Sequence, residues 1–75
     1  MRNYGEEMKA QRQMHGLSQR DLARETGIKQ QNISRWENGQ AIPSIENCEI
    51  LADFYGITID ELIGRDRIGN LKKED

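Results

Sequence analysis

Two glutamines and an arginine stand close together in the stretch from Ser18 to Gly39, SQRDLARETGIKQQNISRWENG, and could read the edges of DNA bases. Gln30 and Gln31 carry carboxamides, which donate and accept hydrogen bonds at once and therefore pair with N6 and N7 of adenine. Arg35 lies about one helical turn further on, where its forked guanidinium suits O6 and N7 of guanine or a phosphate. These three residues are the candidate base-reading set.

The same stretch has the pattern of two short amphipathic helices joined by a turn. Ser18 can cap the first helix, and Gly27 can end it in the left-handed conformation that glycine adopts without steric cost. The second helix is predicted over about residues 29–37, with Ile33 and Trp36 on the core side. Such a helix-turn-helix presents its second helix to the major groove of DNA.

Three further short helices are predicted around this unit. The first runs over about residues 5–15, a longer helix begins after Ser44, and Thr58 caps a short last helix. The helix after Ser44 is expected to bury one face made of Ile45, Cys48, Leu51, Ala52 and Tyr55. The predicted fold class is therefore all-α, a compact bundle of about five short helices.

The domain limits follow from this pattern. Residues 1–64 are predicted to form one DNA-binding domain, with the helix-turn-helix at 18–38. Residues 65–75 are predicted to be a polar C-terminal tail. Within it, Ile68 and Leu71 are three residues apart and could form one last apolar turn.

Composition excludes several classes of protein. A chain of 75 residues with 32% charged and 5% aromatic residues suits a small helical domain and leaves no room for a deep catalytic cleft. No apolar run approaches the roughly 18 residues that span a bilayer, and the polar first residues do not form a secretion signal. The single cysteine fits a reducing compartment. A cytoplasmic protein that does not bind membranes is expected.

Charge is unevenly distributed along the chain, although the net charge is only −2. Residues 9–35 hold six basic and two acidic side chains, whereas residues 36–66 hold seven acidic side chains and one basic side chain. Such asymmetry can create a basic binding face and an acidic solvated face. An ordinary charged helical surface is the alternative explanation of the charges alone.

The motifs together resemble a known family. LSQRDLARETGI, then ISRWENG, then Pro43 followed by SIENCEILADFYGITIDELI, is similar to the Cro/repressor-type helix-turn-helix domains, the xenobiotic-response-element family of phages and bacteria. GIKQQNISRWENG resembles in particular the recognition segment of the lambdoid phage repressors. The resemblance covers about residues 5–63. It implies a lambda-repressor-like fold and a sequence-specific transcriptional regulator, a repressor that binds an inverted-repeat operator in double-stranded DNA as a homodimer.

The resemblance also implies roles for the residues that flank the base-reading set. Gln19 matches a glutamine that binds a DNA phosphate and braces the first recognition residue, here Gln30. Asn38 matches a phosphate contact just after the recognition helix. The other backbone or flanking candidates are Lys29, Asn32 and Gln40. Because Gln40 stands where some phage repressors place a basic residue, few phosphate contacts and modest affinity are expected from one copy.

Arg12 and Glu37 match a pair that often forms an ion pair between the first and third helices of this family. Their predicted role is structural, since a charge on each of two packed helices needs a partner. Gln11 departs from the family pattern, because an apolar residue usually occupies this position of the first helix.

The sequence gives no support for catalysis or for a cofactor. The serines have no evident base beside them, there is no phosphate-binding glycine loop, and a lone His15 cannot share a metal site with a second histidine. Trp36 and Cys48 are expected in the core, and Met14 is expected on the surface. We therefore predict a protein that is not an enzyme and holds no metal.

Two other functions stay open at this point. One is a protein-interaction module, such as an antitoxin, in which the fold mainly holds a partner protein. The other is a DNA-binding fragment whose C-terminal sensing or dimerising domain lies outside this chain. The first predicts weak and non-selective DNA binding, and the second predicts a monomer that binds a half-site weakly.

Overall fold

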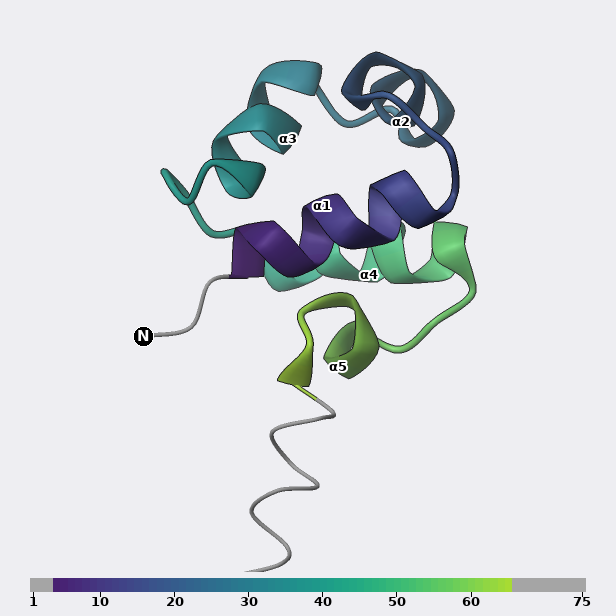
Figure 1. Cartoon of the computed structure of the whole chain (residues 1–75), viewed down its shortest axis with the longest axis vertical. Coiled ribbons are helices and arrows are strands. Elements are labelled where there is room, and N and C mark those ends of the chain that lie inside the picture. The colour runs from purple at the N-terminus through teal and green to yellow at the C-terminus, as the bar shows by residue number, and fades with distance from the viewer. Residues whose placement is uncertain (1–3, 66–75) are drawn as a thin grey trace, which may run out of the picture.

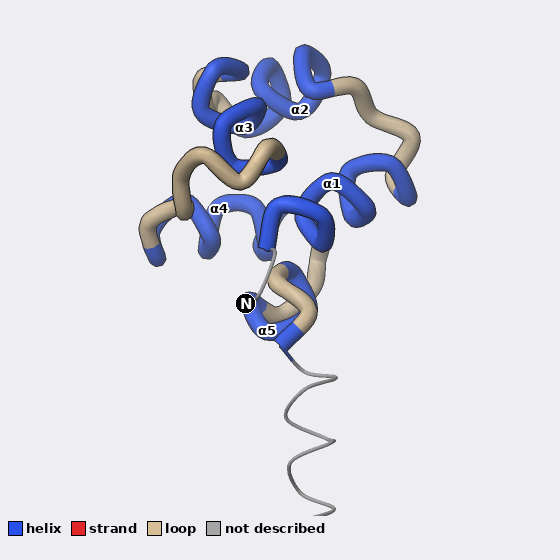
Figure 2. The backbone as a smooth tube through the Cα atoms, turned by 60° about the vertical axis from the view of Figure 1, so that its left-hand side comes forward, coloured by secondary structure: helices blue, strands red, loops and turns tan. Residues whose placement is uncertain are grey.

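The structure, a computed structural model, describes residues 4–65 and contains five α-helices there. They are α1 (Tyr4–Met14), α2 (Gln19–Thr26), α3 (Gln30–Glu37), α4 (Ile45–Tyr55) and α5 (Ile59–Leu62). α2 and α3 lie at one end of the bundle, α1 and α4 cross its middle, and α5 lies at the other end (Figure 1, Figure 2). The described residues form no strand, which confirms the predicted all-α class.

Short polar side chains set where the helices begin. The hydroxyls of Ser18, Ser44 and Thr58 each accept a hydrogen bond from the backbone N–H three residues on, at 3.0, 3.1 and 3.0 Å. These bonds satisfy backbone donors that the first turn of a helix leaves unpaired. At the end of α2, Gly27 adopts a left-handed conformation (φ 79°), and its N–H donates to the Ala23 carbonyl at 2.9 Å. The turn before α3 therefore depends on glycine.

The core lies where α1, α2 and α3 meet α4 and α5. Its buried apolar side chains are Met8, Leu22, Ile28, Ile33, Trp36, Cys48, Leu51, Tyr55 and Leu62. This set includes the expected core positions Trp36 and Cys48, and Met14 is exposed as expected. None of the helices in residues 4–65 has the length and apolar character that crossing a bilayer requires.

The prediction that Ile45 belongs to the buried face of α4 is wrong. Its side chain is 75% exposed, whereas Cys48, Leu51, Ala52 and Tyr55 are buried. Ile45 is the first residue of α4. It lies about 60° around the helix axis from Cys48, and on the far side of Cys48 from Leu51, so it falls at the edge of the buried arc. Spacing alone did not reveal this edge.

Cys48 and His15, whose side chains can act in catalysis or metal binding, are held in packing contacts here. Burial raises the pKa of the Cys48 thiol, which disfavours a reactive thiolate. The exposed ring of His15 packs on Tyr55, with 4.5 Å between ring centroids, and its Nδ1 lies 2.9 Å from the Gln11 carbonyl oxygen. Within residues 4–65, no three His, Cys, Asp or Glu side chains are grouped so as to hold a metal ion. The predicted tail at Ile68 and Leu71 lies outside the described residues.

Gly5 allows α1 to pass close to the end of α3. A Cβ at this position would lie 2.4 Å from the Trp36 carbonyl oxygen and 2.7 Å from that of Glu37. Because both obstructing atoms are backbone atoms, the helices must move apart to admit a methyl group. We expect Gly5→Ala to lower the free energy of unfolding by about 1–3 kcal/mol, as overpacking does. Chemical denaturation checks this value, and Gln13→Ala on the exposed side of α1 should change it little.

Tyr55 carries a buried hydroxyl with no hydrogen-bond partner among the described residues. Burial and the charge of Glu37 raise the pKa of Tyr55 to about 12, against a smaller opposing effect of Arg12. Because the pKa of Tyr55 is higher in the folded state than in the unfolded state, the folded state keeps the phenol proton to higher pH. The contribution of Tyr55 to the free energy of unfolding is therefore complete below pH 10 and is lost as the pH rises towards 12. Tyr55→Phe should remove this pH dependence and leave neutral-pH stability unchanged or up to about 1 kcal/mol higher. Denaturation at pH 7 and pH 11 tests both effects, and a large loss at pH 7 would show that the hydroxyl is bonded.

Candidate nucleic-acid interface

α3 separates a buried face from an exposed one. Ile33 is among the most deeply buried side chains of the protein, and Trp36 packs beside it in the core. Gln30, Gln31 and Arg35 are exposed. Gln31 and Arg35 are four residues apart and therefore lie about 40° apart around the helix. The helix is thus anchored on one side and presents polar side chains with hydrogen-bonding capacity on the other.

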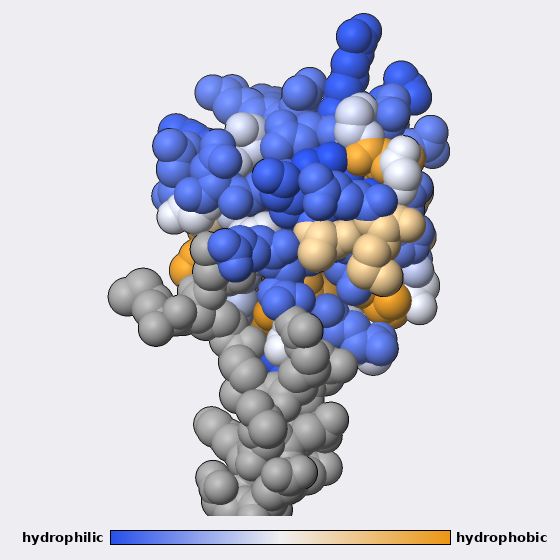
Figure 3. Space-filling model, viewed as in Figure 1, coloured by the Kyte–Doolittle hydropathy of each residue, from blue (hydrophilic) through white to orange (hydrophobic). Residues whose placement is uncertain are grey.

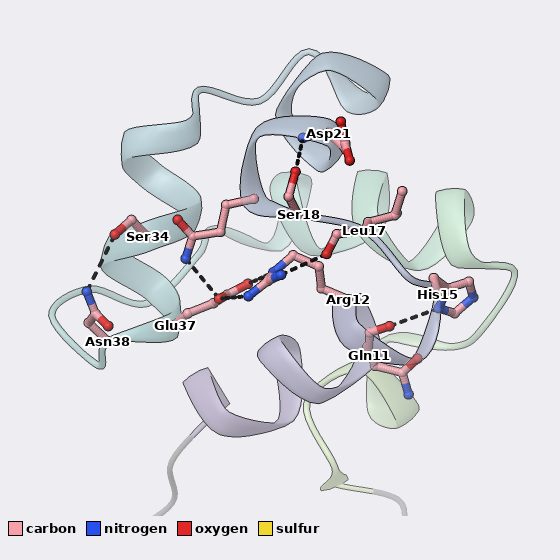
Figure 4. A network of polar contacts seen from close by, with 10 residues as sticks. Gln11, Arg12, His15, Leu17, Ser18, Asp21, Ser34, Glu37 and Asn38 are labelled. Carbon is pink, nitrogen blue, oxygen red and sulfur yellow. Dashed lines mark hydrogen bonds and ion pairs between the residues drawn. The ribbon is translucent and has the colours of Figure 1, made fainter.

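Flanking polar residues extend this exposed surface at both ends of α3. Lys29 is the residue that precedes the helix, and its exposed side chain makes no cap hydrogen bond. Asn38 and Gln40 are exposed after the helix, whereas Asn32 is half-buried. The amide Nδ2 of Asn38 donates to Ser34 Oγ at 3.5 Å (Figure 4).

Ser34, which is half-buried, also belongs to this surface, and the sequence pattern alone did not single it out. It lies four residues after Gln30 and four residues before Asn38, on the same side of the helix. The signal that points to it in the sequence is this four-residue spacing. We add Ser34 to the candidate contact residues.

A buried ion pair joins α1 to the end of α3. Arg12 Nε donates to Glu37 Oε2 at 2.7 Å, and Arg12 Nη2 donates to Glu37 Oε1 at 2.8 Å. The third nitrogen, Nη1, donates to the Leu17 carbonyl oxygen at 2.8 Å (Figure 4). The two residues are only 8% and 9% exposed. This two-pronged geometry fixes the angle between the helices as well as their distance.

Gln19 is a third member of the same network. Its Nε2 donates to Glu37 Oε1 at 3.0 Å, so the carboxylate holds the first residue of α2 together with α1 and α3. The resemblance implied that Gln19 braces Gln30, but no hydrogen bond of the described residues joins the two. The bond to Glu37 uses only the amide nitrogen of Gln19, so its amide oxygen can still accept a hydrogen bond, and the bracing of Gln30 stays a prediction.

The network also determines the charge state of Glu37. Burial opposes ionisation, but the hydrogen bonds from Arg12 and Gln19, with the charges of Arg12 and Lys9, hold the pKa of Glu37 below its ordinary value of 4.5. Glu37 is therefore a carboxylate at neutral pH. It balances the buried guanidinium, and the exposed cations near α3 are left available for an anionic ligand.

The surface over α2 and α3 is mostly hydrophilic (Figure 3). Its exposed cations include Arg20, Lys29 and Arg35. Arg24 is exposed as well, but its Nη2 lies 2.9 Å from Asp21 Oδ1 in an ion pair. The exposed cations can attract phosphates, while the amides and Arg35 can contact base edges.

Comparison with known proteins identifies the architecture. The family model described as helix-turn-helix matches residues 8–62, which is most of the chain. This match confirms the resemblance to Cro/repressor-type domains and the lambda-repressor-like fold. No solved structure matches the chain significantly.

Several characterised proteins are similar to the chain. It is 28% identical over 72 residues to the HTH-type transcriptional activator BcrR of Enterococcus faecalis, covering 96% of this chain and 35% of that protein. It is 32% identical over 66 residues to the antitoxin PezA of Streptococcus pneumoniae, covering 88% of this chain and 42% of that protein. It is 37% identical over 60 residues to the cryptic phage CTXphi transcriptional repressor RstR of Vibrio cholerae, covering 80% of this chain and 54% of that protein.

The chain therefore spans roughly a third to a half of the length of these relatives. The family match agrees with the arrangement of α2 and α3. The chain belongs to the Cro/repressor-type helix-turn-helix family, and the relatives that it matches include proteins named as transcriptional regulators.

Proposed function

We propose that this protein represses transcription by binding an inverted-repeat operator through α3. The observation that carries the proposal is the division of α3 into a face fixed in the core by Ile33 and Trp36 and an exposed face with Gln30, Gln31 and Arg35. A rigid helix with exposed amides and a guanidinium suits the major groove, which is wide enough to admit a helix. A bound repressor would block access to a promoter.

The proposed division of labour separates base reading from backbone contact. Gln30 and Gln31 would pair with adenines, and Arg35 would pair with guanine. The backbone contacts would come from polar and basic residues around α3, namely Gln19, Lys29, Asn32, Ser34, Asn38 and Gln40. The phosphate contacts supply most of the non-specific affinity, whereas the base contacts select the sequence.

A homodimer is part of this proposal. Two copies related by a two-fold axis would place their recognition helices in successive major grooves about 34 Å apart. A single copy offers few cations close to α3, so one half-site would be bound with modest affinity. The symmetric site would bind more tightly, because both half-sites are then engaged by one particle.

Salt dependence tests the assignment of backbone contacts. We expect Lys29→Gln to reduce the slope of log binding constant against log salt concentration by about 0.9, the change for one lost phosphate contact. Fluorescence anisotropy with a labelled duplex measures the slope. Arg65→Gln is the matched control and should leave the slope unchanged, because exposed Arg65 follows α5, the helix at the other end of the bundle from α3 (Figure 1). Equal slopes for wild type and Lys29→Gln would remove Lys29 from the interface.

A protein-binding role is the second candidate, and its support is the similarity to a protein named as an antitoxin. In that case the fold would hold a partner protein, and binding to duplex DNA would be weak and insensitive to sequence. Sequence preference in the purified chain therefore distinguishes the two candidates.

A further inference from the structure

α4 has one face without a partner in the described part of the chain. Its inner side packs into the core, whereas its other side exposes Glu46, Glu49 and Asp53. Ile50 and Phe54 lie beside these acids, four residues apart, and are 38% and 40% exposed. At 100° per residue, these five side chains fall within an arc of about 140°. We call them the outer face of α4.

The charge of this region has one sign. Residues 38–64 contain five acidic residues and neither lysine nor arginine. The ion pairs between Arg12 and Glu37 and between Arg24 and Asp21 lie elsewhere, and none of the three carboxylates of the outer face forms an ion pair with another described residue. The carboxylates of the outer face therefore keep their charge available for a ligand. Ile50 and Phe54 beside them expose apolar surface whose burial by a ligand would be favourable.

We propose that the outer face of α4 docks a basic amphipathic segment of another protein. The lysines or arginines of that segment would meet Glu46, Glu49 and Asp53, and its apolar side chains would cover Ile50 and Phe54. Charge complementarity of this kind steers association and rejects partners of the same sign. It excludes nucleic acid and anionic lipid, because both would be repelled.

A second copy of this chain fits the face poorly. Two outer faces packed against each other would bring three carboxylates from each copy together, which costs free energy. Packing against the basic side of another copy would cover the exposed cations around α3 and would form a head-to-tail contact, which ends only where the rotation between copies closes a ring. A separate basic partner avoids both problems.

Docking at α4 is independent of the proposed DNA contacts. α4 contributes none of the residues assigned to base or phosphate binding, so the partner and DNA could be bound at the same time. The inference therefore stands or falls separately from the proposed function.

A synthetic 18-residue helix of lysine and leucine, with leucines on one face, is the probe. It is titrated into the ¹⁵N-labelled full chain and followed by heteronuclear NMR. A peptide of the same composition with a scrambled order is the control. We expect shifts confined to α4 and its neighbours, and at least fivefold tighter binding of the amphipathic peptide than of the scrambled one.

Matched variants distinguish the charge of the outer face of α4 from the net charge of the whole protein. Glu49→Gln with Asp53→Asn should weaken peptide binding at least fivefold. Glu25→Gln with Asp60→Asn removes the same charge from exposed positions elsewhere and should change it less than twofold. Phe54→Gln should abolish the preference for the amphipathic peptide. Circular dichroism establishes that each variant folds, and Ile50→Gln replaces Phe54→Gln if the latter unfolds.

Four results would overturn the proposal. The first is equal binding of the two peptides, and the second is equal weakening by the two charge variants. The third is a concentration-dependent dimer in sedimentation that Phe54→Gln dissociates, because a second copy would then cover the face. The fourth is a change of the α4 resonances in the free chain on Lys72→Gln with Lys73→Gln, because the chain's own tail would then cover it.

Discussion

Replacing Glu37 with alanine is expected to lower the free energy of unfolding by about 3–5 kcal/mol, the cost of leaving a buried charge without its partner. The Arg12 guanidinium would lose two hydrogen bonds, of 2.7 and 2.8 Å, in surroundings that water barely reaches. Gln19 would lose its acceptor as well. A domain of this size has a total stability of only about 4–11 kcal/mol. The variant should therefore be largely unfolded in mild denaturant.

The double replacement Arg12→Met with Glu37→Leu is the control for this prediction. Because it removes both charges, it should destabilise the fold less than Glu37→Ala does. Urea denaturation monitored by Trp36 fluorescence measures all three proteins. An unchanged midpoint for Glu37→Ala would mean that the ion pair contributes nothing to the fold.

The lowered pKa of Glu37 also predicts how the free energy of unfolding depends on pH. The pKa of Glu37 is lowered in the fold, so its contribution is fully present above the ordinary value of 4.5 and is lost as the pH falls through the lowered value. The Glu37→Gln variant should lack this acid-dependent loss. Identical acid profiles for the two proteins would assign acid unfolding to other carboxylates.

Replacing Gln30 and Gln31 together with alanine is expected to remove most of the preference for the operator sequence. Each well-formed pair between a carboxamide and adenine discriminates against a wrong base by about 1–3 kcal/mol. The double change should therefore lower the ratio of specific to non-specific affinity by a factor of about 30 or more. Non-specific binding and its salt dependence should persist, since the phosphate contacts are untouched.

Gln11→Ala with Gln13→Ala is the matched control, because it removes two glutamines of α1 that have no assigned DNA contact. Anisotropy titrations with the operator and with a shuffled duplex give the affinity ratio for each variant. Site preference that survives in the Gln30 and Gln31 variant would show that another surface reads the bases.

Much of the fold could be predicted because local signals fix it. Ser18, Ser44 and Thr58 are effective helix caps whatever surrounds them, and Gly27 ends a helix by its own conformational freedom. Ile45 shows the limit of such reasoning. Helical spacing gives a direction around the axis but does not say how far the neighbouring helices extend. The edge of the core is a tertiary property.

The candidate site shows the same limit more strongly. The exposure of Gln31 and Arg35 follows from their distance around α3 from Ile33 and Trp36, which sequence spacing provides. Gln19 bonds to Glu37 because α1 places Arg12 beside the Glu37 carboxylate, within reach of α2. Such a contact among three helices has no sequence signature, so the resemblance suggested the ion pair of Arg12 and Glu37 but not the bond from Gln19 to it.

Selection of binding sites from a random pool of double-stranded DNA tests the central claim most directly. The purified 75-residue chain is the selecting protein, and the enriched duplexes are sequenced after several rounds. We predict a two-fold-symmetric site with half-sites about one helical turn apart, in which adenine and guanine occupy the positions facing Gln30, Gln31 and Arg35. A pool that stays random, with binding lost at moderate salt, would contradict sequence-specific recognition by α3.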